Sequence, residues 1–110
     1  MRAVFALQNN TLTLETTAIS DADTVCSLTN HVYWNLAGHD SGTIDGQLLY
    51  VRSDEYLETD GDTIPTGHRL SLAGTCLDFR KPVFLRGLEA DHTFLLPWDN
   101  GFHTVGQIQD

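Results

Sequence analysis

Basic residues are scarce in this chain of 110 residues: Lys and Arg number 6 against 15 Asp and Glu, which gives a formal net charge of −9. Nucleic acids and anionic membrane surfaces attract proteins that concentrate Lys and Arg on one face. The charge balance therefore disfavours both as partners, and we expect neither. An uncharged small molecule is compatible with it.

Long apolar runs are also missing, because no stretch approaches the ~18 apolar residues of a membrane-spanning helix. The apolar start of the chain gives way to polar Gln8 too soon for the apolar region of a secretory signal peptide. The only cysteines, Cys26 and Cys76, form no C-x-x-C pair and have no histidine at zinc-finger spacing. We therefore expect two buried, reduced thiols and a cytoplasmic location.

Motifs for nucleotide, phosphate or metal chemistry are absent from the sequence. There is no glycine-rich phosphate loop, dinucleotide fingerprint or serine nucleophile elbow. His39, His68 and His103 show no metal-ligand spacing, and the segment 60–62 lacks the further ligands of a calcium loop, so a solvated turn is expected there. We predict neither a metal site nor a cofactor.

The apolar residues recur with a period of two rather than 3.6, which predicts an all-β chain. With 41% hydrophobic residues there is material for one core, so we expect a single antiparallel β-sandwich domain. Strands are expected at 11–19, at 24–29 leading into the following histidine segment, and at 47–52, 69–73, 84–85 and 93–96.

Turns and loops are expected between these strands. The segments 21–23 and 38–42 carry turn-forming residues, and 99–101 (Asp-Asn-Gly) is a strong turn signal. The acidic stretch from Asp54 to Gly67 is punctuated by glycine and proline, which indicates an exposed loop.

The most informative pair is His31 and Tyr33, two residues apart in a β-type run that ends at Gly38. On a strand these two side chains would share a face. An imidazole titrates near neutrality and exchanges protons without a cofactor, and a phenol beside it can orient a polar ligand. The pair is a candidate acid/base half-site.

The same residues carry a resemblance to a known family. The segment 28–38, LTNHVYWNLAG, resembles the histidine motif L-T-N-H-S-Y-F-N-L-A-G of the aldose 1-epimerases, or galactose mutarotases. Three further stretches match in the family's order: DGDTIPTG at 60–67, GTCLDFRKP at 74–82 and DHTFLL at 91–96. Val32 and Trp34 stand where the motif usually has Ser and Phe.

The resemblance implies that residues 1–110 are a single partial domain, one portion of the family's large antiparallel supersandwich, without its N-terminal and C-terminal parts. It implies that His31 is the acid that protonates the ring oxygen of a hexose such as galactose or glucose, and that Asp91 binds sugar hydroxyls. No cofactor is implied, and the partner is a monosaccharide. Oligomeric state is left undetermined.

Each assignment has a structural alternative. Asp91 is also a plausible turn residue bonded to its own backbone. Tyr33 is a candidate for contact with the sugar, and it is equally well explained as a strand residue packed in the core with its hydroxyl hydrogen-bonded. His92 would face the opposite side from Asp91 and is expected to be structural.

The resemblance also implies that important groups lie elsewhere. The family's base glutamate normally follows the D-H-x-F segment at a greater distance than this chain extends, and a second histidine and an arginine normally precede Thr11. We therefore expect an aldose 1-epimerase chain that is catalytically incomplete. Two alternatives stay open: a non-catalytic carbohydrate-binding or interaction module, and a segment of a larger polypeptide.

Overall fold

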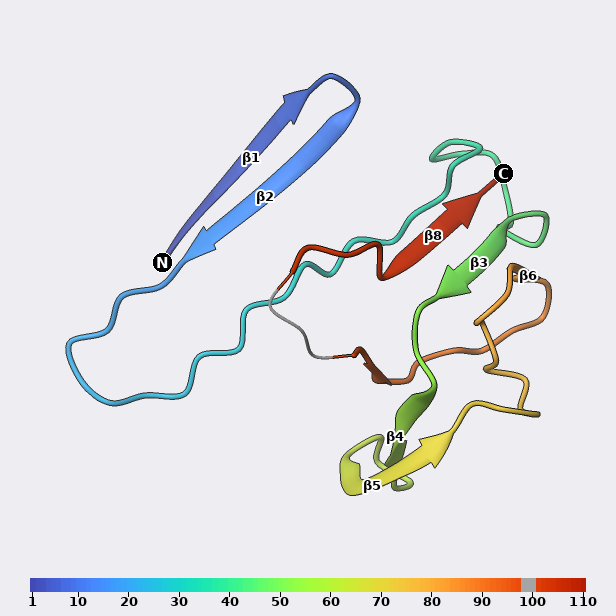
Figure 1. The fold of residues 1–110 in the computed structure, drawn as a ribbon. Helices are drawn as coiled ribbons and strands as arrows, with labels where there is room; N and C mark the ends of the chain where they lie inside the picture. Colours follow the sequence, from blue (N-terminus) through green and yellow to red (C-terminus); the bar gives the residue numbers. More distant parts are fainter. Residues whose placement is uncertain (98–100) are drawn as a thin grey trace. The chain divides into compact units, whose positions relative to one another are not determined.

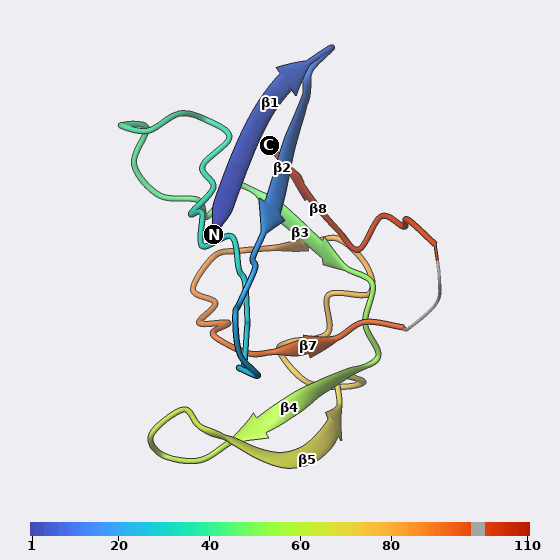
Figure 2. The same ribbon diagram turned by 90° about the vertical axis from the view of Figure 1, so that its left-hand side faces the viewer.

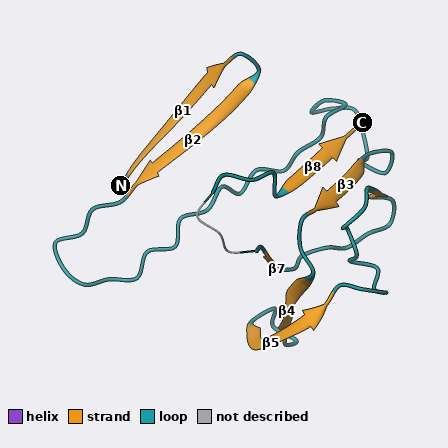
Figure 3. Ribbon diagram, in the orientation of Figure 1, coloured by secondary structure: helices purple, strands orange, loops and turns teal. Residues whose placement is uncertain are grey.

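The computed structural model describes residues 1–97 and 101–110 and divides into two compact units, Met1–Tyr33 and Trp34–Asp110. All regular structure in the described residues is β, in small antiparallel sheets without a helix (Figures 1 and 3). The all-β, antiparallel prediction is confirmed. Among these residues there is also no helix long and apolar enough to cross a membrane.

The first unit contains one hairpin, in which β1 (Arg2–Gln8) pairs with β2 (Thr11–Thr17). Asn9 and Asn10 form its two-residue turn with φ of 49° and 61°. Positive φ at both positions is typical of the turn whose twist matches that of paired strands, and asparagine adopts it at low cost. The strand predicted from residue 11 is confirmed, whereas β1 was not predicted.

The strand predicted at 24–29 is wrong, because no strand lies between Thr17 and Leu48. Val25 in this segment is 94% exposed. β-branched residues favour strands mainly through packing and pairing with a neighbour, and no strand in residues 1–97 or 101–110 pairs with this segment. A segment whose residues favour the extended conformation forms no β-ladder unless another strand pairs with it.

The second unit holds two three-stranded sheets, one ordered β6-β3-β8 (Figure 1) and the other β5-β4-β7 (Figure 2). Their strands are β3 (Leu48–Val51), β4 (Glu55–Thr59), β5 (Pro65–Ser71), β6 (Val83–Phe84), β7 (Phe94–Leu95) and β8 (Gly106–Gln109). The strands predicted near 47–52, 69–73, 84–85 and 93–96 are thus confirmed in place. The turn predicted at 99–101 includes positions outside the described residues.

The acidic stretch is mainly a hairpin rather than the predicted loop, since β4 and β5 pair through it. Only its tip is a loop, where Oδ1 of Asp60 accepts hydrogen bonds from the backbone N–H groups of Asp62 (2.9 Å) and Ile64 (3.0 Å). Exposed acidic side chains on a strand do not prevent pairing, because the ladder uses backbone groups. Sequence charge misled the prediction here.

The core of the second unit comes from Leu72, Leu77 and Phe79, all buried and all between β5 and β6. Phe79 is 0% exposed, packs its ring 5.7 Å from that of Phe94, and accepts a hydrogen bond at its carbonyl from Val51 N–H. The segment 74–82 therefore closes the core.

The cysteine prediction is half wrong. Cys26 and Cys76 are both free thiols, as expected, but both are exposed rather than buried. Cys76 lies in the core-closing segment next to buried Leu77, yet its own side chain faces solvent.

Candidate functional site

His31 and Tyr33 lie beside one another, with ring centroids 5.2 Å apart and planes tilted by 39°. Both side chains are exposed, Tyr33 to 87%. Neither makes a hydrogen bond or ion pair with any residue that the structure describes. The strand expected around them is absent, but the two rings share a side, which leaves the imidazole and the phenol accessible to a ligand.

Directly after this pair, in the second unit, Asn35 organises a turn. Its Oδ1 accepts hydrogen bonds from Ala37 N–H (3.2 Å) and from Nε2 of buried Gln47 (2.9 Å), and its Nδ2 donates to the carbonyl of Gly42 (3.3 Å). Gly38 closes the turn with a φ of 116°, a conformation that favours glycine. The N-L-A-G end of the motif thus has a structural explanation, because it joins this turn to the start of β3.

Asp91 is exposed, and its carboxylate has no hydrogen bond or ion pair within residues 1–97 and 101–110. The alternative of a turn residue bonded to its own backbone therefore has no observation in its favour. A carboxylate with free acceptor positions suits a polyol, since it can accept hydrogen bonds from two adjacent hydroxyls.

His92 is half-buried, and its ring lies 5.4 Å from that of Tyr56 in an edge-to-face arrangement. Its burial differs from that of Asp91, as alternation predicts. His31 and Tyr33 belong to the first unit and Asp91 to the second. Their assembly into one sugar site stays a prediction.

Sequence reasoning missed an ion-pair cluster in the segment 74–82. Arg80 donates two hydrogen bonds to the Asp78 carboxylate, from Nε (2.8 Å) and Nη2 (2.7 Å), and its Nη1 lies 3.3 Å from Oδ1 of Asp54. The hydrogen bonds from Arg80 lower the pKa of Asp78 to about 2, and the two carboxylates raise that of Arg80. The D-x-R spacing was the available signal for half of this cluster.

A second cluster lies on the β4–β5 hairpin. Thr66 donates a hydrogen bond to Oε2 of Glu58 (2.7 Å), and Nδ1 of His68 lies 3.0 Å from the same oxygen. These hydrogen bonds, that of Thr66 first, lower the pKa of Glu58. The residues 60–67, which match the family motif, thus lie in a hairpin in which Thr66 and His68 contact the carboxylate of Glu58.

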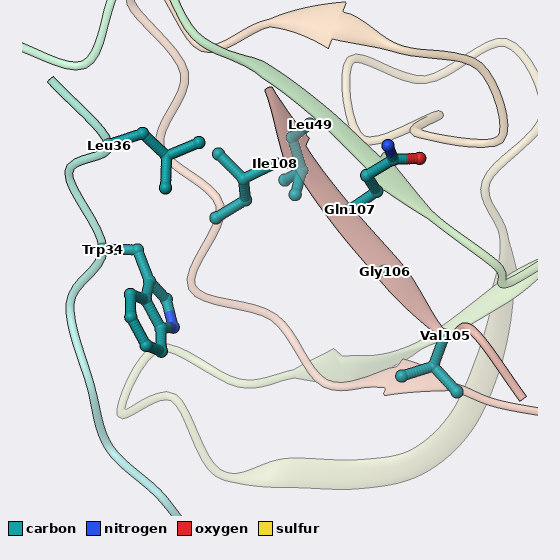
Figure 4. Close-up of a pocket in the computed structure, with 7 residues that line it drawn as sticks. All are labelled: Trp34, Leu36, Leu49, Val105, Gly106, Gln107 and Ile108. Carbon is teal, nitrogen blue, oxygen red and sulfur yellow. The ribbon is translucent and has the colours of Figure 1, made fainter. Parts of the chain in front are cut away.

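Two cavities bear on function by what lines them. One, of about 450 Å³, is lined by Trp34, Leu36, Leu49, Val105, Gly106, Gln107 and Ile108 (Figure 4). None of these described lining residues has a side chain that can serve as an acid or base. Another, of about 580 Å³, is lined by Asp78, Arg80, Lys81 and Val83, where the carboxylate is already bound by arginine.

In the part of the chain that the structure describes, no group of three or more His, Cys, Asp or Glu side chains converges. Imidazole side chains can act as a general acid or base. Of these, His31 combines exposure with an aromatic neighbour.

Comparison with known proteins agrees with the motifs. A family model described as aldose 1-epimerase matches residues 1–107. The chain is 38% identical over 102 residues to galactose mutarotase from Homo sapiens, covering 93% of this chain and 30% of that protein. It is 39% identical over 88 residues to aldose 1-epimerase from Streptococcus thermophilus (78% and 25%), and 31% identical over 97 residues to that of Haemophilus influenzae (86% and 28%).

The chain belongs to the aldose 1-epimerase family, and the resemblance inferred from the motifs is confirmed. It spans about 30% or less of the length of these curated relatives. No solved structure matches it.

Proposed function

We propose that this chain is part of an aldose 1-epimerase that interconverts the α and β anomers of a hexose such as galactose or glucose. The observation that carries the proposal is the family match over residues 1–107, in which the motif histidine is an exposed imidazole beside a phenol. A negatively charged chain is compatible with an uncharged sugar as its ligand.

The chemistry requires two proton transfers. Opening the cyclic hemiacetal protonates the ring oxygen while the proton of the C1 hydroxyl is removed; rotation about C1–C2 and reclosure then give the other anomer. We assign the first transfer to His31, whose exposed ring has no competing hydrogen-bond partner among the described residues. Asp91 would accept hydrogen bonds from sugar hydroxyls, and Tyr33 would contact the ligand beside His31.

We propose that the chain alone is catalytically incomplete. No glutamate in the matched motifs has the context of the family's base, and the chain covers a minority of its relatives' length. General acid or base catalysis contributes about 10²- to 10⁴-fold per group, so an unassisted acid would leave the rate near that of solvent. A cytoplasmic location stays a prediction.

The alternative is a carbohydrate-binding β module without catalysis. It is favoured by the carboxylate of Asp91, which has no hydrogen bond or ion pair within residues 1–97 and 101–110. The two proposals share the sugar contacts and differ in whether proton transfer by His31 contributes to rate.

Polarimetry of freshly dissolved α-D-glucose tests the proposal with wild type, His31→Ala and the matched control His39→Ala. His39 is also exposed, but its neighbour is Asp40 rather than an aromatic ring. We expect the wild-type chain to stay near the solvent rate. Acceleration that disappears only in His31→Ala would refute incompleteness and support the acid role; acceleration equal in all three proteins would refute the role of His31.

A further inference from the structure

The backbone hydrogen bonds that join β4 to the segment around β7 end before they reach Asp91. Leu57 N–H donates to the carbonyl of Thr93 (2.9 Å), and Tyr56 pairs with Phe94. Among the described residues, no backbone hydrogen bond involves Asp91 or His92. The ladder therefore ends two residues before it reaches the carboxylate that the family motif assigns to sugar.

The side chain of His92 extends the contact beyond the ladder. Its ring meets the Tyr56 ring edge-on, 5.4 Å between centroids and 83° between planes. Tyr56 in turn packs against the buried core cluster of Leu72, Leu77 and Phe79. A chain of contacts thus runs from the core through Tyr56 to the residue directly after Asp91.

Exposed and half-buried residues alternate from Asp91 to Phe94, and this pattern indicates how the contact between His92 and Tyr56 orients the backbone. His92 and Phe94 are half-buried on the core side, and Asp91 and Thr93 are exposed. In an extended chain, fixing one side chain inward directs its neighbour outward. Release of the His92 ring would free the backbone of Asp91, which no hydrogen bond among the described residues holds.

We propose that His92 is a positioning residue: its ring, wedged against Tyr56, fixes the extended backbone that presents Asp91 to a sugar. The inference deepens the proposed function and rests on Asp91 as a ligand of the sugar. His92 does not touch the substrate. It acts through Asp91.

The shape of the ring, rather than its nitrogen, carries this role. Nδ1 of His92 is out of contact with solvent and has no hydrogen-bond partner among the described residues. An unpaired buried polar atom opposes folding. Phenylalanine at this position would keep the edge-to-face contact and remove the unpaired atom, so His92→Phe is the rescuing variant and His92→Ala the disruptive one.

The experiment measures backbone order and sugar affinity in the 110-residue chain. Nitrogen-15 relaxation reports the order of the Asp91 amide, and titration with D-galactose gives Kd, in wild type, His92→Ala, His92→Phe and Val83→Ala. Val83 packs against the same core from β6, so its truncation controls for loss of core stability. Asp91→Asn reports the sugar contact itself.

We expect His92→Ala to disorder the Asp91 amide and raise Kd about tenfold, the factor that follows when one residue's backbone must be ordered on binding. His92→Phe and Val83→Ala should match wild type in both measurements. An ordered Asp91 amide in His92→Ala, or equal disorder in Val83→Ala, overturns the inference. Galactose affinity that is absent in wild type or unchanged in Asp91→Asn instead refutes the proposed sugar role, while the relaxation result still decides whether His92 positions its neighbour.

Discussion

Truncation of Phe79 is the sharpest test of how the second unit is held together. Phe79 is fully buried, packs its ring against that of Phe94 and lies in the motif segment that closes the core. Phe→Ala substitutions in cores cost about 3–5 kcal/mol through lost transfer energy and the cavity left behind. At roughly 0.05–0.15 kcal/mol per residue, the whole second unit has only about 4–12 kcal/mol of stability.

Phe79→Ala is therefore expected to lower the urea midpoint sharply or to unfold the unit in buffer, as followed by far-ultraviolet circular dichroism. Phe79→Leu keeps most of the apolar volume and should cost less, about 1–1.5 kcal/mol. Val25→Ala, at a position 94% exposed, is the control and should stay within about 0.5 kcal/mol of wild type. A cost below about 1 kcal/mol for Phe79→Ala would refute the core described above.

Two further predictions concern the motif segments. The pKa of Asp78 is depressed in the folded chain to about 2, so the stabilisation from its pair with Arg80 is complete above the ordinary aspartate pKa of ~3.9 and is lost as pH falls toward 2. Acid titrations followed by circular dichroism should therefore show a smaller loss of stability over that pH window in Asp78→Asn than in wild type. An equal loss in both proteins would contradict the pairing. Asn35→Ala removes three hydrogen bonds and leaves the buried side-chain amide of Gln47 without this acceptor, so it should cost about 1–3 kcal/mol. Hydrogen exchange should speed up at the backbone amide of Ala37, which loses its acceptor; wild-type exchange at this amide would exclude the role assigned to Asn35.

Local pattern was a good guide where strands pair with sequence neighbours or alternate clearly. The alternation after residue 11 and the apolar run at 47–52 both predicted strands that the structure contains. The segment 24–29 has an equal strand preference but no partner strand within residues 1–97 and 101–110, and pairing is a tertiary property that composition does not encode. The loop prediction for the acidic stretch was wrong for the converse reason, because its charged residues indicated an exposed loop although its backbone pairs in an antiparallel ladder.

The contacts of the candidate site residues also fall into those that local spacing predicted and those that depend on tertiary structure. Two ring positions separated by one residue were expected to share a side, and His31 and Tyr33 do, without a strand. The Asp78–Arg80 pair could be predicted from the spacing of the two residues. Asp54, the second carboxylate near Arg80, directly precedes β4 and is 26 residues away in the sequence, so no local motif indicates it. The contact of His92 with Tyr56 likewise depends on β4 and β7 pairing, which no local motif predicts.

We propose that His31 and Asp91 contact the same sugar molecule. Titration of the chain with D-galactose, observed through the proton resonance of the His31 ring at Cε1, tests it directly in wild type and Asp91→Ala. We predict a saturable shift in wild type that disappears in Asp91→Ala. A His31 resonance that does not respond to galactose, or that responds equally in both proteins, would contradict the claim.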